Sequence, residues 1–86
     1  MTESLKRAIK EAIVRSLRLP IGPNEIEDDA PLFGEGLGLD SIDALELVLE
    51  IERTFGVAIS DERTGAAVLR SVTTIAEHIA SARAAS

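Results

Sequence analysis

Two residues suggest nucleophilic chemistry, because a serine hydroxyl beside an imidazole forms the nucleophile and the base of many hydrolases. They are Ser41 and His78, the single histidine of the chain. Residues 36–41 read Gly-Leu-Gly-Leu-Asp-Ser, which is not the G-x-S-x-G turn that exposes a catalytic serine, and no strand is predicted before them. A lone histidine on a terminal helix is usually structural or solvated. We therefore expect no catalytic residue and no enzyme activity.

The glycines and acidic residues do not form a nucleotide or metal motif. Gly34, Gly36 and Gly38 are not followed by the last glycine of a dinucleotide fingerprint, because residue 41 is serine, nor by the Gly-Lys-Ser/Thr of a phosphate-binding loop. The acidic stretches lack the spacing and the central glycine of a calcium loop. The chain has no cysteine, which excludes disulfides and thiolate zinc sites. The sequence thus predicts no metal site.

Ser41 also suits the attachment of a phosphate ester. If Asp40 caps a helix, Ser41 is the first residue of that helix, beside unpaired backbone N–H groups at the positive end of the helix dipole. Phosphate groups bind favourably at such a place. A serine in the first turn of a helix is also ordinary on structural grounds alone, so its position leaves both interpretations open.

The first element that must position these residues is an amphipathic helix over residues 3–18. Its apolar side chains recur at intervals of three and four and form one stripe, made of Leu5, Ala8, Ile9, Ala12, Ile13 and Leu17. The bases Lys6, Arg7, Lys10 and Arg15 are expected to face away from the stripe, and Pro20 to end the helix. Residues 20–39 contain all three prolines but also apolar side chains that can dock on a core, so we expect a long ordered loop.

Residues 41–56 give the strongest helix signal. Asp40 can cap the start, and Gly56 can end the helix in a left-handed conformation. One charged stripe runs along it, made of Asp43, Glu46, Glu50 and Arg53, and nearly every other position is apolar: Ile42, Leu45, Leu47, Val48, Leu49, Ile51 and Phe55. A helix that is apolar over so much of its circumference is expected to be buried on several sides and to lie centrally among other helices.

Two further helices complete the predicted fold. Ser60 can open a short one, and residues 74–77, Thr-Ile-Ala-Glu, match a capping box at the start of the last helix. The apolar face of that last helix would hold Ile75, Ala76, Ile79 and Ala80. The fold class is therefore all-α, a four-helix bundle of three main helices plus one short helix, with a long ordered loop after the first helix. We expect a single domain over residues 1–86.

The charge of the chain is unevenly distributed. The net charge is −6, yet residues 19–52 contain ten acidic side chains and no basic one, whereas residues 1–18 contain five basic and two acidic ones. Such an acidic block repels nucleic acid and anionic lipid and attracts basic protein surfaces. No apolar run reaches the ~18 residues that a membrane span needs. With no cysteine present, we expect a cytoplasmic monomer with protein partners, no nucleic-acid partner and no membrane insertion.

The segment around Ser41 resembles the signature of the acyl carrier proteins. Residues 37–48 read Leu-Gly-Leu-Asp-Ser-Ile-Asp-Ala-Leu-Glu-Leu-Val, and the family has an Asp-Ser-Leu triplet after Leu-Gly-x, with acidic residues two and five positions after the serine. Asp43 and Glu46 match those two acids. Residues 50–57 and 72–75 extend the resemblance over essentially the whole chain.

This resemblance implies that Ser41 receives 4′-phosphopantetheine from coenzyme A, transferred by a holo-acyl-carrier-protein synthase or another phosphopantetheinyl transferase. Acyl groups would be held on the thiol of that arm as thioesters, for fatty-acid, specialised-lipid or polyketide biosynthesis. Other partners would be acyl synthetases, ketosynthases and acyltransferases with basic docking patches. The implied recognition residues are Asp40, Ile42, Asp43, Glu46 and Glu50. The implied acyl pocket is lined by Leu47, Ile51, Phe55, Ile59, Val68, Ile75 and Ile79.

Three departures from the family pattern favour a dedicated carrier of a specialised lipid or polyketide pathway. Ile42 replaces the usual leucine after the serine, Arg53 is a base where housekeeping fatty-acid carriers tend to have an acid, and a few extra residues lie around residues 63–69. Two alternatives stay open. One is an amino-acyl carrier of the peptidyl or D-alanyl type, whose surface around the serine is usually less acidic, and the other is an unmodified acidic helical adaptor.

Overall fold

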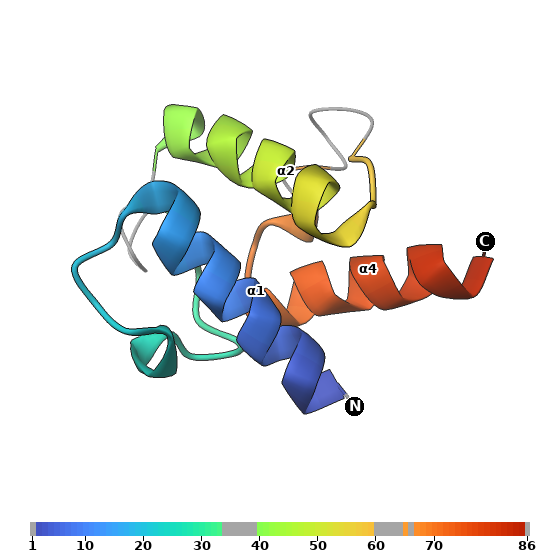
Figure 1. Cartoon of the computed structure of the whole chain (residues 1–86), viewed down its shortest axis with the longest axis horizontal. Coiled ribbons are helices and arrows are strands. Elements are labelled where there is room, and N and C mark those ends of the chain that lie inside the picture. The colour runs from blue at the N-terminus through green and yellow to red at the C-terminus, as the bar shows by residue number, and fades with distance from the viewer. Residues whose placement is uncertain (1, 34–39, 60–64, 66, 86) are drawn as a thin grey trace.

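The computed structural model describes residues 2–33, 40–59, 65 and 67–85. Their helices are α1 (Thr2–Leu17), the short 3-10 helix η1 (Pro23–Glu25), α2 (Ser41–Phe55) and α4 (Val72–Ala85), as Figure 1 shows. Residues 65, 67 and 68 also have helical backbone, in the region of the predicted short helix. Its predicted start at Ser60 lies outside the described residues, as does the turn at residues 36–39. The predicted all-α fold class is confirmed.

Among the three long helices that the structure describes, α1 contacts both of the others. It packs against both α2 and α4, whereas α2 and α4 approach each other less closely (Figure 1). Its residues Ile9, Ala12 and Ile13 are buried, as the predicted apolar stripe requires. The helix after residue 40 was predicted to be buried on several sides, and this is wrong: α2 lies against α1 and keeps one face in solvent.

The end of α1 is set by backbone conformation before the chain reaches Pro20. Arg18 adopts a left-handed conformation, with φ of 52°. The N–H of Leu19 then donates to the carbonyl oxygen of Val14 at 3.2 Å, which satisfies an unpaired group of the last turn. The helix thus ends at Leu17, and the chain turns into the long loop.

The described part of the loop is docked on the core, as its apolar residues predict. Ile26 and Leu32 are buried. The N–H of Leu32 donates to the carbonyl oxygen of Arg70 at 3.0 Å, and the N–H of Thr73 donates to the carbonyl oxygen of Asp28 at 3.0 Å. The loop is therefore bonded to the start of α4 by its backbone as well as by its apolar side chains.

Asp28 also joins this loop to α1 through its side chain. Its carboxylate forms ion pairs with Lys10 and with Lys6, the latter at 3.3 Å. The hydrogen bond from Lys10 lowers the pKa of the Asp28 carboxyl below its ordinary value, against a smaller opposing effect of burial. The two lysines lie beside the apolar stripe and neutralise an acid of the loop, so they are not simply solvated.

The start of α4 differs from the predicted capping box at residues 74–77. The helix begins one turn earlier, at Val72. The Ser71 hydroxyl accepts a hydrogen bond from the N–H of Thr74 at 3.2 Å, and the Thr74 hydroxyl accepts one from the N–H of Ser71 at 2.9 Å. This reciprocal cap satisfies two N–H groups of the first turn and places Val72 in the core. Ala80, predicted on the apolar face, is exposed.

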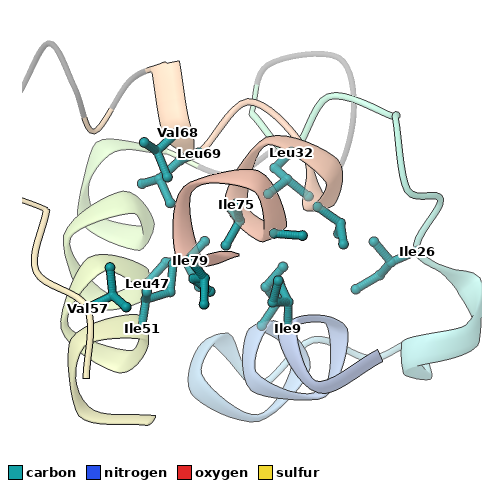
Figure 2. Close-up of a cluster of buried hydrophobic side chains, with 13 residues drawn as sticks. Ile9, Ile26, Leu32, Leu47, Ile51, Val57, Val68, Leu69, Ile75 and Ile79 are labelled. Atoms are coloured by element: carbon teal, nitrogen blue, oxygen red, sulfur yellow. The ribbon is translucent and has the colours of Figure 1, made fainter. Parts of the chain in front are cut away.

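The buried side chains form one aliphatic core. Figure 2 shows Leu47 and Ile51 of α2 facing Ile79 of α4, with Ile9 of α1 and Leu32 of the loop on the other sides of α4. Every member of this core is aliphatic. Within the described residues, no helix combines the length and the apolar character needed to cross a bilayer.

Candidate functional site

The start of α2 is defined by Asp40. One oxygen of its carboxylate accepts hydrogen bonds from the N–H groups of Ile42 and Asp43, at 3.0 and 3.1 Å. The Asp43 carboxylate accepts in return from the N–H of Asp40, at 3.0 Å. This capping box makes Ser41 the first residue of the helix, as the sequence predicts.

The same capping box corrects the electrostatic expectation for Ser41. The N–H groups predicted to be unpaired at this helix end include those of Ile42 and Asp43, and both donate to Asp40. A phosphate ester at Ser41 would therefore meet the helix dipole together with two carboxylates, and not a set of free amides. A partner that brings positive charge to this end of α2 would offset the repulsion between those anions.

The outer face of α2, which we define as Ile42, Leu45, Glu46, Leu49 and Arg53, carries a strip of exposed apolar side chains. Ile42 is 70% exposed, Leu45 61% and Leu49 52%. Ile42 was predicted to face a partner and is exposed. Leu45 and Leu49 were counted with the buried side of an apolar helix, and that expectation is wrong. Their spacing of three and four, interleaved with Glu46 and Arg53, is the signal that could have identified this strip. Large exposed apolar side chains in one strip are typical of a protein-binding surface.

The predicted acidic recognition residues fall into two groups. Asp40 and Glu46 are exposed and Asp43 is half-buried, all near the start of α2. Glu50 is buried, so its prediction as part of an exposed charged stripe is wrong. The physical reason is that α1 crosses α2 at this point and places Arg15 over the Glu50 carboxylate.

Glu50 is held by three donors from two helices. Its Oε2 accepts from Arg15 Nη2 at 2.7 Å and from the Thr54 hydroxyl at 3.0 Å, and its Oε1 accepts from Arg53 Nη2 at 3.0 Å. The hydrogen bond from Arg15 lowers the pKa of the Glu50 carboxyl below its ordinary value, although burial opposes that shift. This network joins α1 to α2 and offers little of the carboxylate to a partner.

The seven predicted acyl-pocket residues come together in the structure. Leu47, Ile51, Val68, Ile75 and Ile79 are buried in one cluster, and Phe55 and Ile59 pack against it half-buried. Leu47 and Ile51 lie between α2 and α4 (Figure 2), where the two helices approach less closely than either approaches α1. His78, which we excluded from catalysis, lies with a ring nitrogen 3.5 Å from the carbonyl oxygen of Ala58.

The chain neighbours of Ser41 on both sides are accessible to solvent. Asp40 and Ile42 are both exposed, whereas Asp43 and Ala44 of the same turn are half-buried. A serine hydroxyl is a group that can form a phosphate ester, and the described residues on either side of Ser41 are exposed.

Comparison with known proteins assigns the chain to a family. The family described as phosphopantetheine attachment site matches residues 7–79. The acyl carrier protein of Sulfurovum sp. (strain NBC37-1) is 38% identical over 58 residues, covering 67% of this chain and 73% of the relative. That of Chloroherpeton thalassium is 37% identical over 60 residues, covering 70% and 71%, and that of Solidesulfovibrio magneticus is 42% identical over 59 residues, covering 69% and 72%.

The family model spans α2 and most of α1 and α4. Members of this family work with phosphopantetheinyl transferases and with biosynthetic enzymes. The chain therefore belongs to the acyl carrier protein family: it is a carrier and not an enzyme, and its prosthetic group is covalently attached 4′-phosphopantetheine.

Proposed function

We propose that Ser41 is the attachment residue and that the chain carries acyl intermediates for fatty-acid, specialised-lipid or polyketide biosynthesis. The Ser41 hydroxyl oxygen would form a phosphodiester with the phosphopantetheinyl group of coenzyme A, and the nucleotide part of coenzyme A would leave. The attached arm supplies the thiol that holds an acyl group as a thioester. The chain has no cysteine, so this thiol would be its only one.

The observation that carries this proposal is the position of Ser41 on α2. The helix begins at Ser41, directly after the exposed capping residue Asp40 and before the exposed Ile42. A residue at such an end can enter the active site of a transferase while the rest of α2 rests on the transferase surface. The match of the family model on both sides of this residue adds support.

The test is a transfer reaction followed by intact mass measurement. The apo protein is incubated with coenzyme A and a broad-specificity phosphopantetheinyl transferase, and one phosphopantetheinyl group should be added. Ser41→Ala should stay folded and gain nothing, whereas Ser81→Ala, which changes an exposed serine on α4, should be modified like the wild type. Addition of the group to Ser41→Ala would exclude Ser41 as the attachment residue.

Partner enzymes would dock on the start of α2. Asp40, Asp43 and Glu46 supply negative charge there, and Ile42 and Leu45 supply apolar surface. Charged contacts at exposed positions are individually weak and sensitive to salt, which suits brief binding to many enzymes. This acidic surface favours an acyl carrier over a carrier of amino-acyl groups.

The acyl chain would enter the core between α2 and α4. Support comes from the aliphatic seam formed by Leu47, Ile51, Ile75 and Ile79, and from the wider spacing of these two helices. Each methylene buried there would contribute about 0.8 kcal/mol. Melting temperatures of the acetyl and octanoyl forms test this: the octanoyl form should melt higher. Coinciding melts would indicate that the acyl chain stays in solvent.

A further inference from the structure

The outer face of α2 changes the sign of its charge along its length. The exposed Glu46 lies near its start, and the half-buried Asp43 borders the face there. Arg53 follows Glu46 by seven residues, or two turns, and so lies on the same flank of the apolar strip. Its side chain is 76% exposed, and that of Arg15, which reaches over from α1, is 62% exposed. The later part of this flank therefore presents guanidinium groups.

Glu50 does not cancel this positive surface. Its carboxylate is 9% exposed and lies beneath the two arginines that bind it. Two bases over one acid leave one positive charge, and the guanidinium groups are the part in contact with solvent. Glu52 is half-buried and lies about 100° around the helix from Arg53, on the opposite flank of the apolar strip.

We propose that the outer face of α2 is a two-sign docking surface, whose natural partner enzyme places basic side chains opposite Asp43 and Glu46 and a carboxylate opposite Arg53 and Arg15. The apolar strip of Ile42, Leu45 and Leu49 runs beside these charges along the helix and would contact an apolar groove of the partner. This inference rests on the proposed function, in which enzymes dock beside Ser41.

The dimensions of a protein interface allow one partner to contact both ends. Ser41 and Arg53 are twelve residues apart on one helix, or about 18 Å. A standard interface covers about 800 Å² on each partner, which corresponds to a patch roughly 30 Å across. Docking in the reverse direction would bring like charges together at both ends, so a partner complementary to both ends can bind α2 in only one direction.

A partner with a wholly basic docking patch makes this testable, because the two ends of α2 should then affect binding in opposite ways. The probe is a bacterial holo-acyl-carrier-protein synthase with such a patch, and KM and kcat for the apo protein are measured from mass time courses. Glu46→Arg should raise KM and Arg53→Glu should lower KM, each about two- to five-fold, the effect expected of one exposed charge contact. In both variants kcat should stay unchanged.

Two further variants provide the controls. Arg7→Glu makes the same change of charge as Arg53→Glu, at a side chain of α1 that is 71% exposed, and should leave KM unchanged. Arg53→Gln keeps a hydrogen-bond donor for Glu50 and should lower KM by a smaller factor, so the result does not depend on whether Arg53→Glu folds fully.

The outcomes separate this inference from the function on which it rests. If Arg53→Glu and Arg53→Gln leave KM unchanged, raise it, or change it only as much as Arg7→Glu does, the two-sign surface is excluded while mass gain still supports the carrier function. If no variant, wild type included, gains a phosphopantetheinyl group, the proposed function fails and the inference fails with it.

Discussion

The two faces of α2 use similar residues in opposite ways. On the inner face, Leu47 and Ile51 are completely buried against α4, whereas on the outer face Ile42, Leu45 and Leu49 remain largely exposed. The acids differ in the same manner, because Glu50 is enclosed by donors from α1 and α2 while Glu46 is exposed. The inner side chains maintain the fold.

This difference shows that residue type alone does not report the role of a position on α2. Exposed aliphatic side chains contribute little to the free energy of unfolding and increase the risk of association. Their presence in one strip next to Ser41 is therefore better explained by binding than by folding. Paired substitutions on the two faces test this distinction.

The apolar side chains should show the largest difference between the faces. Ile51→Ala should lower the free energy of unfolding by about 2–5 kcal/mol, because it opens a cavity in the core between α2 and α4. Leu49→Ala, on the outer face of the same helix, should change it by less than about 0.5 kcal/mol. Urea denaturation of both variants measures this, and equal losses would contradict the division into two faces.

Substitution of the buried Glu50 should lower the free energy of unfolding more than substitution of the exposed Glu46. Glu50→Gln should lower the free energy of unfolding by about 1–3 kcal/mol, because hydrogen bonds to the buried carboxylate lose their ionic character. Glu46→Gln removes the same charge from an exposed position and should cost less than about 0.5 kcal/mol. If the two variants unfold at the same urea concentration, the Arg15–Glu50–Arg53 network does not stabilise the fold.

The contribution of the Glu50 carboxylate to the free energy of unfolding should disappear in acid. Because Arg15 lowers the pKa of the folded-state carboxyl below its ordinary value of 4.5, the ionised form stabilises the fold. That contribution is complete above the unfolded pKa and is lost as pH falls through the lower, folded pKa. The difference in unfolding free energy between wild type and Glu50→Gln should thus be constant between about pH 7 and pH 5 and shrink below it. If the difference in unfolding free energy between wild type and Glu50→Gln grows as the pH falls, this prediction is wrong.

The cap at the start of α2 should have a smaller and more local effect. Asp40→Ala should lower the free energy of unfolding by about 1 kcal/mol, because the N–H groups of Ile42 and Asp43 lose their acceptor. Hydrogen exchange should accelerate at those two amides. Asp29→Ala, which removes an exposed acid from the loop, is the matched control and should do neither. Unchanged exchange at Ile42 and Asp43 would exclude the capping role of Asp40.

The sequence predicted α2 well because the signals at its ends are local. Asp40 bonds to residues two and three positions away, and Gly56 adopts the left-handed conformation that glycine allows, with φ of 68°. Such contacts depend on a few neighbouring residues and not on the rest of the fold. The start of α4 was harder to predict, because Ser71 and Thr74 compete as caps and the burial of Val72 decides between them.

By itself, the sequence determined the helical fold class, the bounds of α2, the docking of the described part of the loop and the position of Ser41 at a helix start. These follow from short-range capping and from the periodicity of apolar residues. Only the tertiary structure decided that α1 contacts both α2 and α4, that Glu50 is buried and that Ile42, Leu45 and Leu49 face solvent. The physical reason is that α2 is apolar nearly all the way round, so its own pattern does not specify which side packs. That choice is made by α1, whose narrower apolar stripe and Arg15 contact only one side of α2.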